Sequence, residues 1–96
     1  MLEKGKVVWI DQTREGKNSR TGEMWQSLDF VIETDERFPR KVKLNLYGAE
    51  RIAKAMLEIG KVMEFEAWVE AHEYDGKWYN EVRVAKVLVN GQNVLL

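Results

Sequence analysis

The sequence predicts an all-β fold with one short helix, in which five strands close into a barrel. Three observations lead to this prediction. Segments 25–34, 41–48 and 61–74 alternate apolar and polar side chains with a period of two, and the apolar run at 6–10 and the partner strand of a predicted hairpin bring the strands to five. One segment, between the third and fourth strands, has helical periodicity instead. The 96 residues include one proline and no linker-like stretch, so we expect a single domain over residues 1–96.

The composition excludes several classes of protein. The absence of cysteine rules out disulfides, thiolate catalysis and cysteine-ligated zinc. The formal net charge of −1 provides no general attraction for nucleic acids or membranes, so any affinity for phosphate groups must come from local patches. The N-terminal segment contains no apolar run long enough for a signal peptide or a membrane span. We therefore expect a cytoplasmic protein that has no membrane partner.

Three strands are predicted in the first half of the chain. The apolar run at 6–10 forms the first, and the polar segment 11–23 is expected to be a long, flexible and basic loop. Segments 25–34 and 41–48 alternate and form the next two strands. The side chains of these two strands that are expected to face the core are Leu28, Phe30, Ile32, Val42, Leu44 and Leu46.

A short amphipathic helix is predicted over residues 49–60. Ile52, Met56 and Ile59 share one face at helical spacing, and we expect this face to close one end of the barrel. Gly60 is expected to end the helix, because glycine readily takes the left-handed conformation found just after helix termini.

The fourth and fifth strands form a predicted hairpin. Residues 61–74 alternate, and Asp75 and Gly76 make a two-residue turn that fixes the register. In that register Trp78 lies on the core side, where we expect it at the rim of the barrel. The predicted cross-strand pairs are Ala67 with Val84, Val69 with Val82, Trp68 with Arg83, His72 with Tyr79, and Tyr74 with Lys77.

One predicted pair in this hairpin is unfavourable, because Glu70 lies opposite Glu81 and like charges repel across an antiparallel pair. Either the register slips at this point or a cation sits between the two carboxylates.

The order of these elements fits the oligonucleotide/oligosaccharide-binding (OB) barrel, in which three strands precede a helix and a two-stranded hairpin follows it. The tail at 86–96 contains an Asn-Gly turn signal and predicts an extra C-terminal hairpin. That hairpin would cover a sheet edge or support self-association. Both roles stay open, and so does a homo-oligomer.

The residue sets needed for catalysis are absent from the sequence. It has one histidine, no cysteine and no glycine-rich phosphate loop, so we expect neither enzymatic activity nor a cofactor. His72 lies beside Glu70 and Glu73, but one histidine among exposed carboxylates is more typical of a solvated strand than of a metal site. Glu64 and Glu66 extend this acidic face without completing the carboxylate cluster of a metal-dependent nuclease.

Basic and aromatic side chains converge on one predicted surface. They alternate away from the core in the second and third strands, where Asn45 is also expected to face solvent, and continue to the hairpin turn. Aromatic faces stack bases, and Lys and Arg follow the phosphate backbone, so the surface predicts binding of single-stranded DNA or RNA with little sequence preference. The predicted stacking residues are Trp25, Tyr47, Tyr74 and Tyr79. The predicted phosphate-binding residues are Arg14, Lys17, Arg20, Arg40, Lys41, Lys43 and Lys77.

Each of these features also has a simpler interpretation. A single ring is as compatible with packing as with base stacking, and Trp68 opposite Arg83 is equally explained by a cation–π pair that stabilises the sheet. Exposed Tyr and Trp also anchor protein interfaces. The alternative function is therefore a protein-interaction OB module, an adaptor or dimer subunit that binds no nucleic acid.

Several stretches resemble known families. "YDGKWYNEVRV" at 74–84 resembles the corresponding hairpin of bacterial single-stranded DNA-binding proteins. The stretches "GKVV", "FVIETDERFPRKV" and "EYDGKWYNEVR" are similar to a small, uncharacterised family of single-OB-domain proteins from Bacteroidetes-type bacteria and their phages. The resemblance covers about residues 5–86. It implies an OB fold and, by analogy, single-strand binding in DNA replication or repair.

Overall fold

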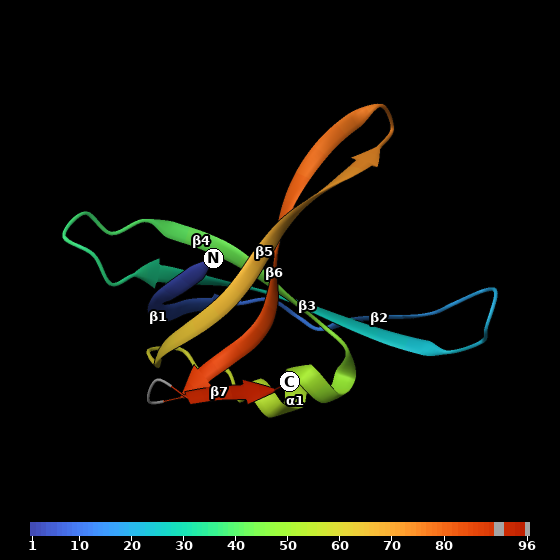
Figure 1. Ribbon diagram of the computed structural model, residues 1–96. Coiled ribbons are helices and arrows are strands. Elements are labelled where there is room, and N and C mark those ends of the chain that lie inside the picture. The colour runs from blue at the N-terminus through green and yellow to red at the C-terminus, as the bar shows by residue number, and fades with distance from the viewer. Residues whose placement is uncertain (90–91, 96) are drawn as a thin grey trace.

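Figure 1 shows the computed structural model of the chain, which describes residues 1–89 and 92–95. The elements in this part of the chain are β1 (Leu2–Ile10), β2 (Arg14–Lys17), β3 (Met24–Thr34), β4 (Lys41–Tyr47), α1 (Ala49–Ala55), β5 (Val62–Tyr74), β6 (Lys77–Val89) and β7 (Gln92–Leu95). No helix among the described residues is long and apolar enough to cross a membrane.

The barrel closes through β1, which pairs antiparallel with both β5 and β3. From β5 the sheet continues to β6, then to β4 through the parallel pair of Asn45 and Arg83, and returns to β3. Five strands thus form a ring, and α1 contacts β3 and β4. The prediction of an all-β fold with one short helix and a five-stranded OB barrel is confirmed.

The hydrophobic core lies inside this ring. Phe30 and Phe65 have no exposed surface, and their ring centroids are 5.2 Å apart with the planes tilted by 53°. Aromatic rings favour such a tilted arrangement over face-to-face stacking. Of the predicted core side chains of β3 and β4, all are buried except Val42, which is partly buried against them. The alternation therefore predicted the inner face of these strands correctly.

The segment predicted as a flexible loop, 11–23, contains the strand β2 instead. Its four residues pair antiparallel with the beginning of β3. Asn18 orders the turn that follows, because its Oδ1 accepts hydrogen bonds from the backbone N–H groups of Arg20 at 2.9 Å and Thr21 at 3.2 Å. The loop prediction was wrong here because β2 buries no apolar face of its own, and only its pairing with β3 defines it as a strand.

The helix is shorter than predicted. It ends at Ala55, and Met56 takes the left-handed conformation with φ of 50° and ψ of 50°. Met56 and Ile59 are exposed, whereas Leu57 packs against the core. The prediction that the helix reaches Gly60 was therefore wrong. A helix this short depends on packing more than on its own propensity, so the turn that brings Leu57 to the core decides where it ends.

The β5–β6 hairpin has the predicted register at every predicted pair. Its far half leaves the barrel and projects as a two-stranded ribbon, which we call the arm (residues 69–81; Figure 1). Trp78 lies in the arm and is 68% exposed, so its predicted place at the barrel rim was wrong. Trp78 is exposed because β5 and β6 are longer than the barrel. Their alternation continues into the arm, where no core is present to bury the inward-facing side chain.

The predicted C-terminal hairpin is present as β7, which pairs antiparallel with β6. The predicted turn at Asn90 and Gly91 lies outside the described residues.

Candidate nucleic-acid interface

Two aromatic rings on β3 and β4 stack on the outside of the barrel. The ring centroids of Trp25 and Tyr47 are 6.4 Å apart, and their planes are within 17° of parallel. Tyr47 lies opposite Ser27 in the sheet, so it shares a face with Trp25 two residues away. Tyr47 is 49% exposed and Trp25 is partly buried. The sheet thus places both rings on the outer face, as the alternation predicted.

Gly16 on β2 supports this stacked pair. It lies opposite Trp25 in the sheet, and a Cβ atom at Gly16 would lie 2.5 Å from Cζ2 and 2.7 Å from Cε2 of the indole. The absence of a side chain therefore allows the indole to rest against the backbone of β2.

Replacing Gly16 by alanine is expected to displace the Trp25 indole, because no side chain fits at that separation. We expect roughly fivefold or weaker binding of oligo(dT), as for the loss of one stacking contact, together with a change in tryptophan emission. Fluorescence titration measures both. Glu15→Ala, on the opposite face of β2, is the control and should bind like the wild type. Unchanged affinity and emission in Gly16→Ala would contradict the role of this contact.

Arg83 connects the arm to the stacked rings. Its guanidinium carbon lies 5.7 Å from the Tyr47 ring centroid, and Nη1 donates to Oδ1 of Asn45 at 3.0 Å. Nη2 of Arg83 is 3.1 Å from Oε2 of Glu81, and its Nε forms an ion pair with Glu70. The register does not slip at the two glutamates. The cation expected between them is Arg83.

Asn45 was predicted to face solvent, but it is only 2% exposed. Its Nδ2 donates to Oγ of Ser27 at 2.8 Å and to Oδ1 of Asp29 at 2.9 Å. It is buried because β6 meets β4 at this residue. The outer face of β4 is therefore divided into two parts by a hydrogen-bonded cluster that holds Arg83 in place.

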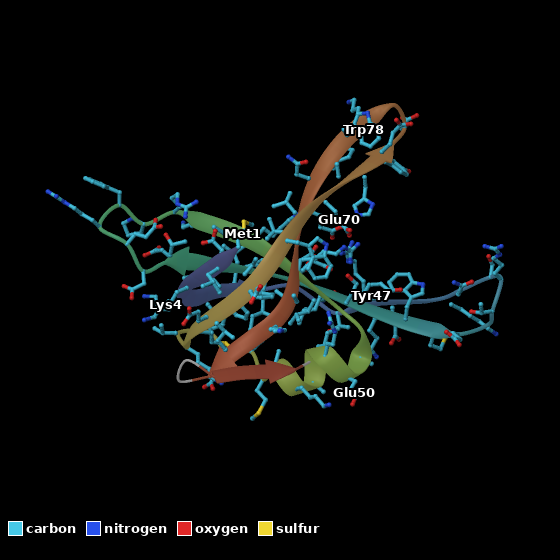
Figure 2. All side chains as sticks on the ribbon, in the orientation of Figure 1. Met1, Lys4, Tyr47, Glu50, Glu70 and Trp78 are labelled. Atoms are coloured by element: carbon cyan, nitrogen blue, oxygen red, sulfur yellow. The ribbon has the colours of Figure 1, made fainter. Side chains whose placement is uncertain are left out.

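A groove of about 330 Å³ lies where the arm joins the barrel. Tyr47 and Trp68 contribute rings to it, and Trp68 is 42% exposed, with Nε1 donating to Oε2 of Glu70 at 3.3 Å. In Figure 2, Tyr47 lies beside the barrel and Glu70 at the base of the arm. The other lining residues are Asn45, Arg51, Arg83 and Val84. The sequence analysis did not select Trp68 as a binding residue, since its nearness to Tyr47 depends on the pairing of β6 with β4.

The arm extends this surface outward. Tyr74, Lys77 and Tyr79 share one face with Trp68, because directly opposed residues of β5 and β6 project to the same side. Tyr74 is 76% exposed and Tyr79 is 53% exposed. Trp78, labelled near the tip of the arm in Figure 2, lies on the other face.

The predicted phosphate-binding residues are distributed unevenly. Lys41 and Lys43 are exposed on β4 and share a face with Tyr47, as predicted. Arg20 is exposed in the β2–β3 turn. Lys17 lies opposite Met24, so it occupies the face of the β2–β3 ribbon away from Trp25. The structure thus places the two β4 lysines on the same outer face as the stacked rings, beyond Asn45, and Lys17 on the other face.

Two of the predicted arginines are already ion-paired. Arg14 Nη2 lies 3.1 Å from Oδ2 of Asp29. Arg40 donates twice to Glu36, at 3.1 Å from both Nε and Nη2, and also lies 3.7 Å from Oε2 of Glu3. A phosphate would compete with these carboxylates, so both arginines are weaker candidates than the sequence suggested.

Comparison with known proteins identifies the family. Residues 3–88 match the model described as a domain of unknown function (DUF3127). The chain belongs to the DUF3127 family. No curated protein matches this DUF3127 chain. Among solved structures it is similar to the SSB domain of a protein from Synechococcus sp., with 12% sequence identity, a TM-score of 0.62, and coverage of 91% of this chain and 90% of that chain. At this identity the similarity supports the OB fold alone.

An acidic cluster in the DUF3127 chain surrounds the arm's only histidine. Ligand atoms of Glu70, His72 and Glu81 lie within 4.8 Å of one another. Arg83 is ion-paired with both carboxylates, and a guanidinium in this position would repel a metal cation. The hydrogen bond from Trp68, aided by the charge of Arg83, holds the pKa of Glu70 below its usual range. Ion pairing with Arg83 accounts for this cluster without a metal.

Proposed function

We propose that this DUF3127 chain acts as one OB domain that binds single-stranded DNA or RNA with little sequence preference and catalyses no reaction. The observation that carries the proposal is the stacked pair of Trp25 and Tyr47, which is open to solvent and continuous with the groove that contains Trp68. Every nucleobase has a π face, so such a surface accepts any sequence.

The energetics favour this use of the rings. Each stacked base contributes about 1–3 kcal/mol, and three neighbouring rings provide enough stacking to offset part of the cost of ordering a flexible strand. The rings are already held by Gly16, Asn45 and Arg83, so binding does not need to order them. Trp25, Tyr47 and Trp68 form the proposed centre, and Tyr74 and Tyr79 extend it along the arm.

The positive charge required for phosphate binding is local. Lys41 and Lys43 follow the stacked rings along β4, and Lys77 lies beside Tyr74 on the arm. Since the chain as a whole carries a net charge of −1, we attribute phosphate binding to these lysines, with smaller contributions from Arg14, Lys17, Arg20 and Arg40.

The resemblance of the β5–β6 hairpin to that of bacterial single-stranded DNA-binding proteins supports the proposal, as does the shared fold with an SSB domain. On this basis we propose a cytoplasmic role in DNA replication or repair. This part of the proposal is an analogy, since it is drawn from similarity of fold.

The direct test is titration of tryptophan fluorescence with oligo(dT) at low and high salt, using the wild type and Lys41→Glu/Lys43→Glu. The wild type should be quenched and should bind more weakly at high salt, because binding releases counterions. Loss of two phosphate contacts should reduce the slope of log K against log salt by about 1.4, and charge reversal should weaken binding by at least about tenfold. Lys54→Glu/Lys61→Glu, which reverses two exposed lysines near α1, is the matched control.

Two results would contradict the proposal. One is the absence of quenching and of a mobility shift at low salt with high micromolar wild-type protein. The other is equal weakening by the two double variants, which would indicate general electrostatic attraction without a binding face.

A second candidate function is a protein-interaction module. It is favoured by Trp78, which is 68% exposed on the face of the arm that does not carry Tyr74 and Tyr79. An exposed tryptophan is a typical anchor for a protein partner, which includes a second copy of this chain. Under this function Lys41→Glu/Lys43→Glu would leave the interaction nearly intact, whereas Trp78→Ala would weaken it.

A further inference from the structure

The turn between β3 and β4 displays an aromatic ring that the proposed binding surface does not include. Phe38 is 76% exposed, and the guanidinium carbon of Arg37 lies 5.4 Å from its ring centroid. The turn lies at the opposite end of the β3–β4 hairpin from α1 (Figure 1). A phenylalanine in this position contributes little to the core, so its exposed face is available to a ligand.

The turn that carries Phe38 is braced. The backbone N–H of Thr34 donates to the carbonyl of Arg40 at 2.8 Å, and the N–H of Arg40 donates to Oγ1 of Thr34 at 2.8 Å. The Arg40 guanidinium holds Glu36 through two hydrogen bonds of 3.1 Å. Pro39 further restricts the backbone of the residue before it, which is Phe38. The ring is thus held on a pre-ordered turn, which lowers the entropic cost of binding through it.

The proposed binding surface leads toward this turn. From Tyr47, the outer face of β4 crosses the cluster of Asn45 and Arg83 and then passes Lys43 and Lys41 before the chain reaches the turn. The seven residues from Lys41 to Tyr47 span about 20 Å at the rise of a β-strand. A stacked nucleic-acid strand covers this distance with roughly six nucleotides, at about 3.4 Å each.

We propose that a bound single strand continues along β4 to this turn, where Phe38 stacks one further base and Arg37 contacts the adjacent phosphate. The inference rests on the proposed function and lengthens the stretch of nucleic acid that the protein contacts. It favours nucleic acid over a protein partner because the route carries two lysines and ends at an arginine beside an exposed ring, which is the combination that single-strand binding requires.

The test compares oligo(dT) of 6 and 15 nucleotides, labelled with fluorescein, by anisotropy with the wild type, Phe38→Ala and Phe38→Trp. A 6-mer held by Trp25, Tyr47 and Trp68 does not reach the turn, whereas a 15-mer does. Phe38→Ala should weaken binding of the 15-mer by about fivefold or more and leave the 6-mer unchanged. Phe38→Trp should bind the 15-mer at least as well as the wild type. Ile59→Ala, which removes another exposed apolar side chain near α1, should match the wild type with both lengths.

The outcomes separate the inference from the proposed function. If the wild type binds both oligonucleotides and Phe38→Ala binds the 15-mer equally well, the inference is wrong and the proposed function stands. If Phe38→Ala weakens both lengths equally, the inferred order of contacts along β4 is wrong. If the wild type binds neither oligonucleotide, the proposed function itself fails.

Discussion

Replacing both Trp25 and Tyr47 by alanine is expected to weaken binding of oligo(dT) by at least about thirtyfold. Each ring is expected to contribute about 1–3 kcal/mol through one stacked base, and the two rings support each other at a centroid distance of 6.4 Å. Because Tyr47 is half exposed and Trp25 only partly buried, their loss should disturb the barrel less than it disturbs the binding surface. Anisotropy titration of labelled oligo(dT) measures the effect.

The matched control is Met56→Ala/Ile59→Ala, which removes two exposed apolar side chains near α1 and should retain wild-type affinity. Thermal unfolding of each variant verifies that the barrel persists. Wild-type affinity in a folded Trp25→Ala/Tyr47→Ala protein would refute base stacking on this pair and would leave the protein-interaction function as the better explanation.

Replacing Phe65 by alanine is expected to lower the free energy of unfolding by about 3–5 kcal/mol. Phe65 is fully buried and packs against Phe30 across the barrel, so alanine would leave a cavity and remove the tilted ring contact. For a chain of this size the unfolding temperature should fall by at least about 12 °C. Urea denaturation followed by far-ultraviolet circular dichroism measures the change in free energy.

Tyr74→Ala provides a control on the same strand. Tyr74 is 76% exposed in the arm, so its removal should change the stability by less than about 0.5 kcal/mol. Similar losses of stability in both variants would contradict the assignment of the core to the barrel and would indicate that the arm packs as tightly as the ring of strands.

Local patterns were enough to predict much of the fold. The alternation in β3 and β4 identified the buried face, because a side-chain period of two leaves few alternatives once one face is apolar. The turn at Asp75 and Gly76 fixed the hairpin register, and both residues have positive φ, 51° and 76°, as such a turn requires. The conflict between Glu70 and Glu81 predicted either a register slip or a cation between them, and the structure shows the second, which is Arg83.

The failures arise where segments distant in sequence meet. Asn45 was expected in solvent because its strand alternates, but the pairing of β6 with β4 at this residue places Arg83 against it and buries it. Trp78 was expected at the rim because its strand alternates, but no local pattern indicates how far the barrel extends along β5 and β6. Trp68 lines the groove because the pairing of β6 with β4 brings it close to Tyr47.

The candidate site was predicted in part. The alternation of side chains along β3 and β4 correctly predicted that Trp25, Tyr47 and the β4 lysines lie on one outer face. It did not reveal that Arg14 and Arg40 are ion-paired, because Asp29 and Glu3 are distant in sequence and approach them only in the folded chain. Charge counted along a sequence therefore overestimates the charge available to a ligand.

The pairing of β1 with β5 has a consequence for how the protein folds. Leu2 lies opposite Glu66, so the ring closes only after more than half of the chain has been made. Such non-local contacts require the entropy of a long loop to be lost before they stabilise the structure, and they slow folding. During synthesis the apolar faces of β1, β3 and β4 remain uncovered until β5 has been made, and in that interval the nascent chain is most prone to aggregation.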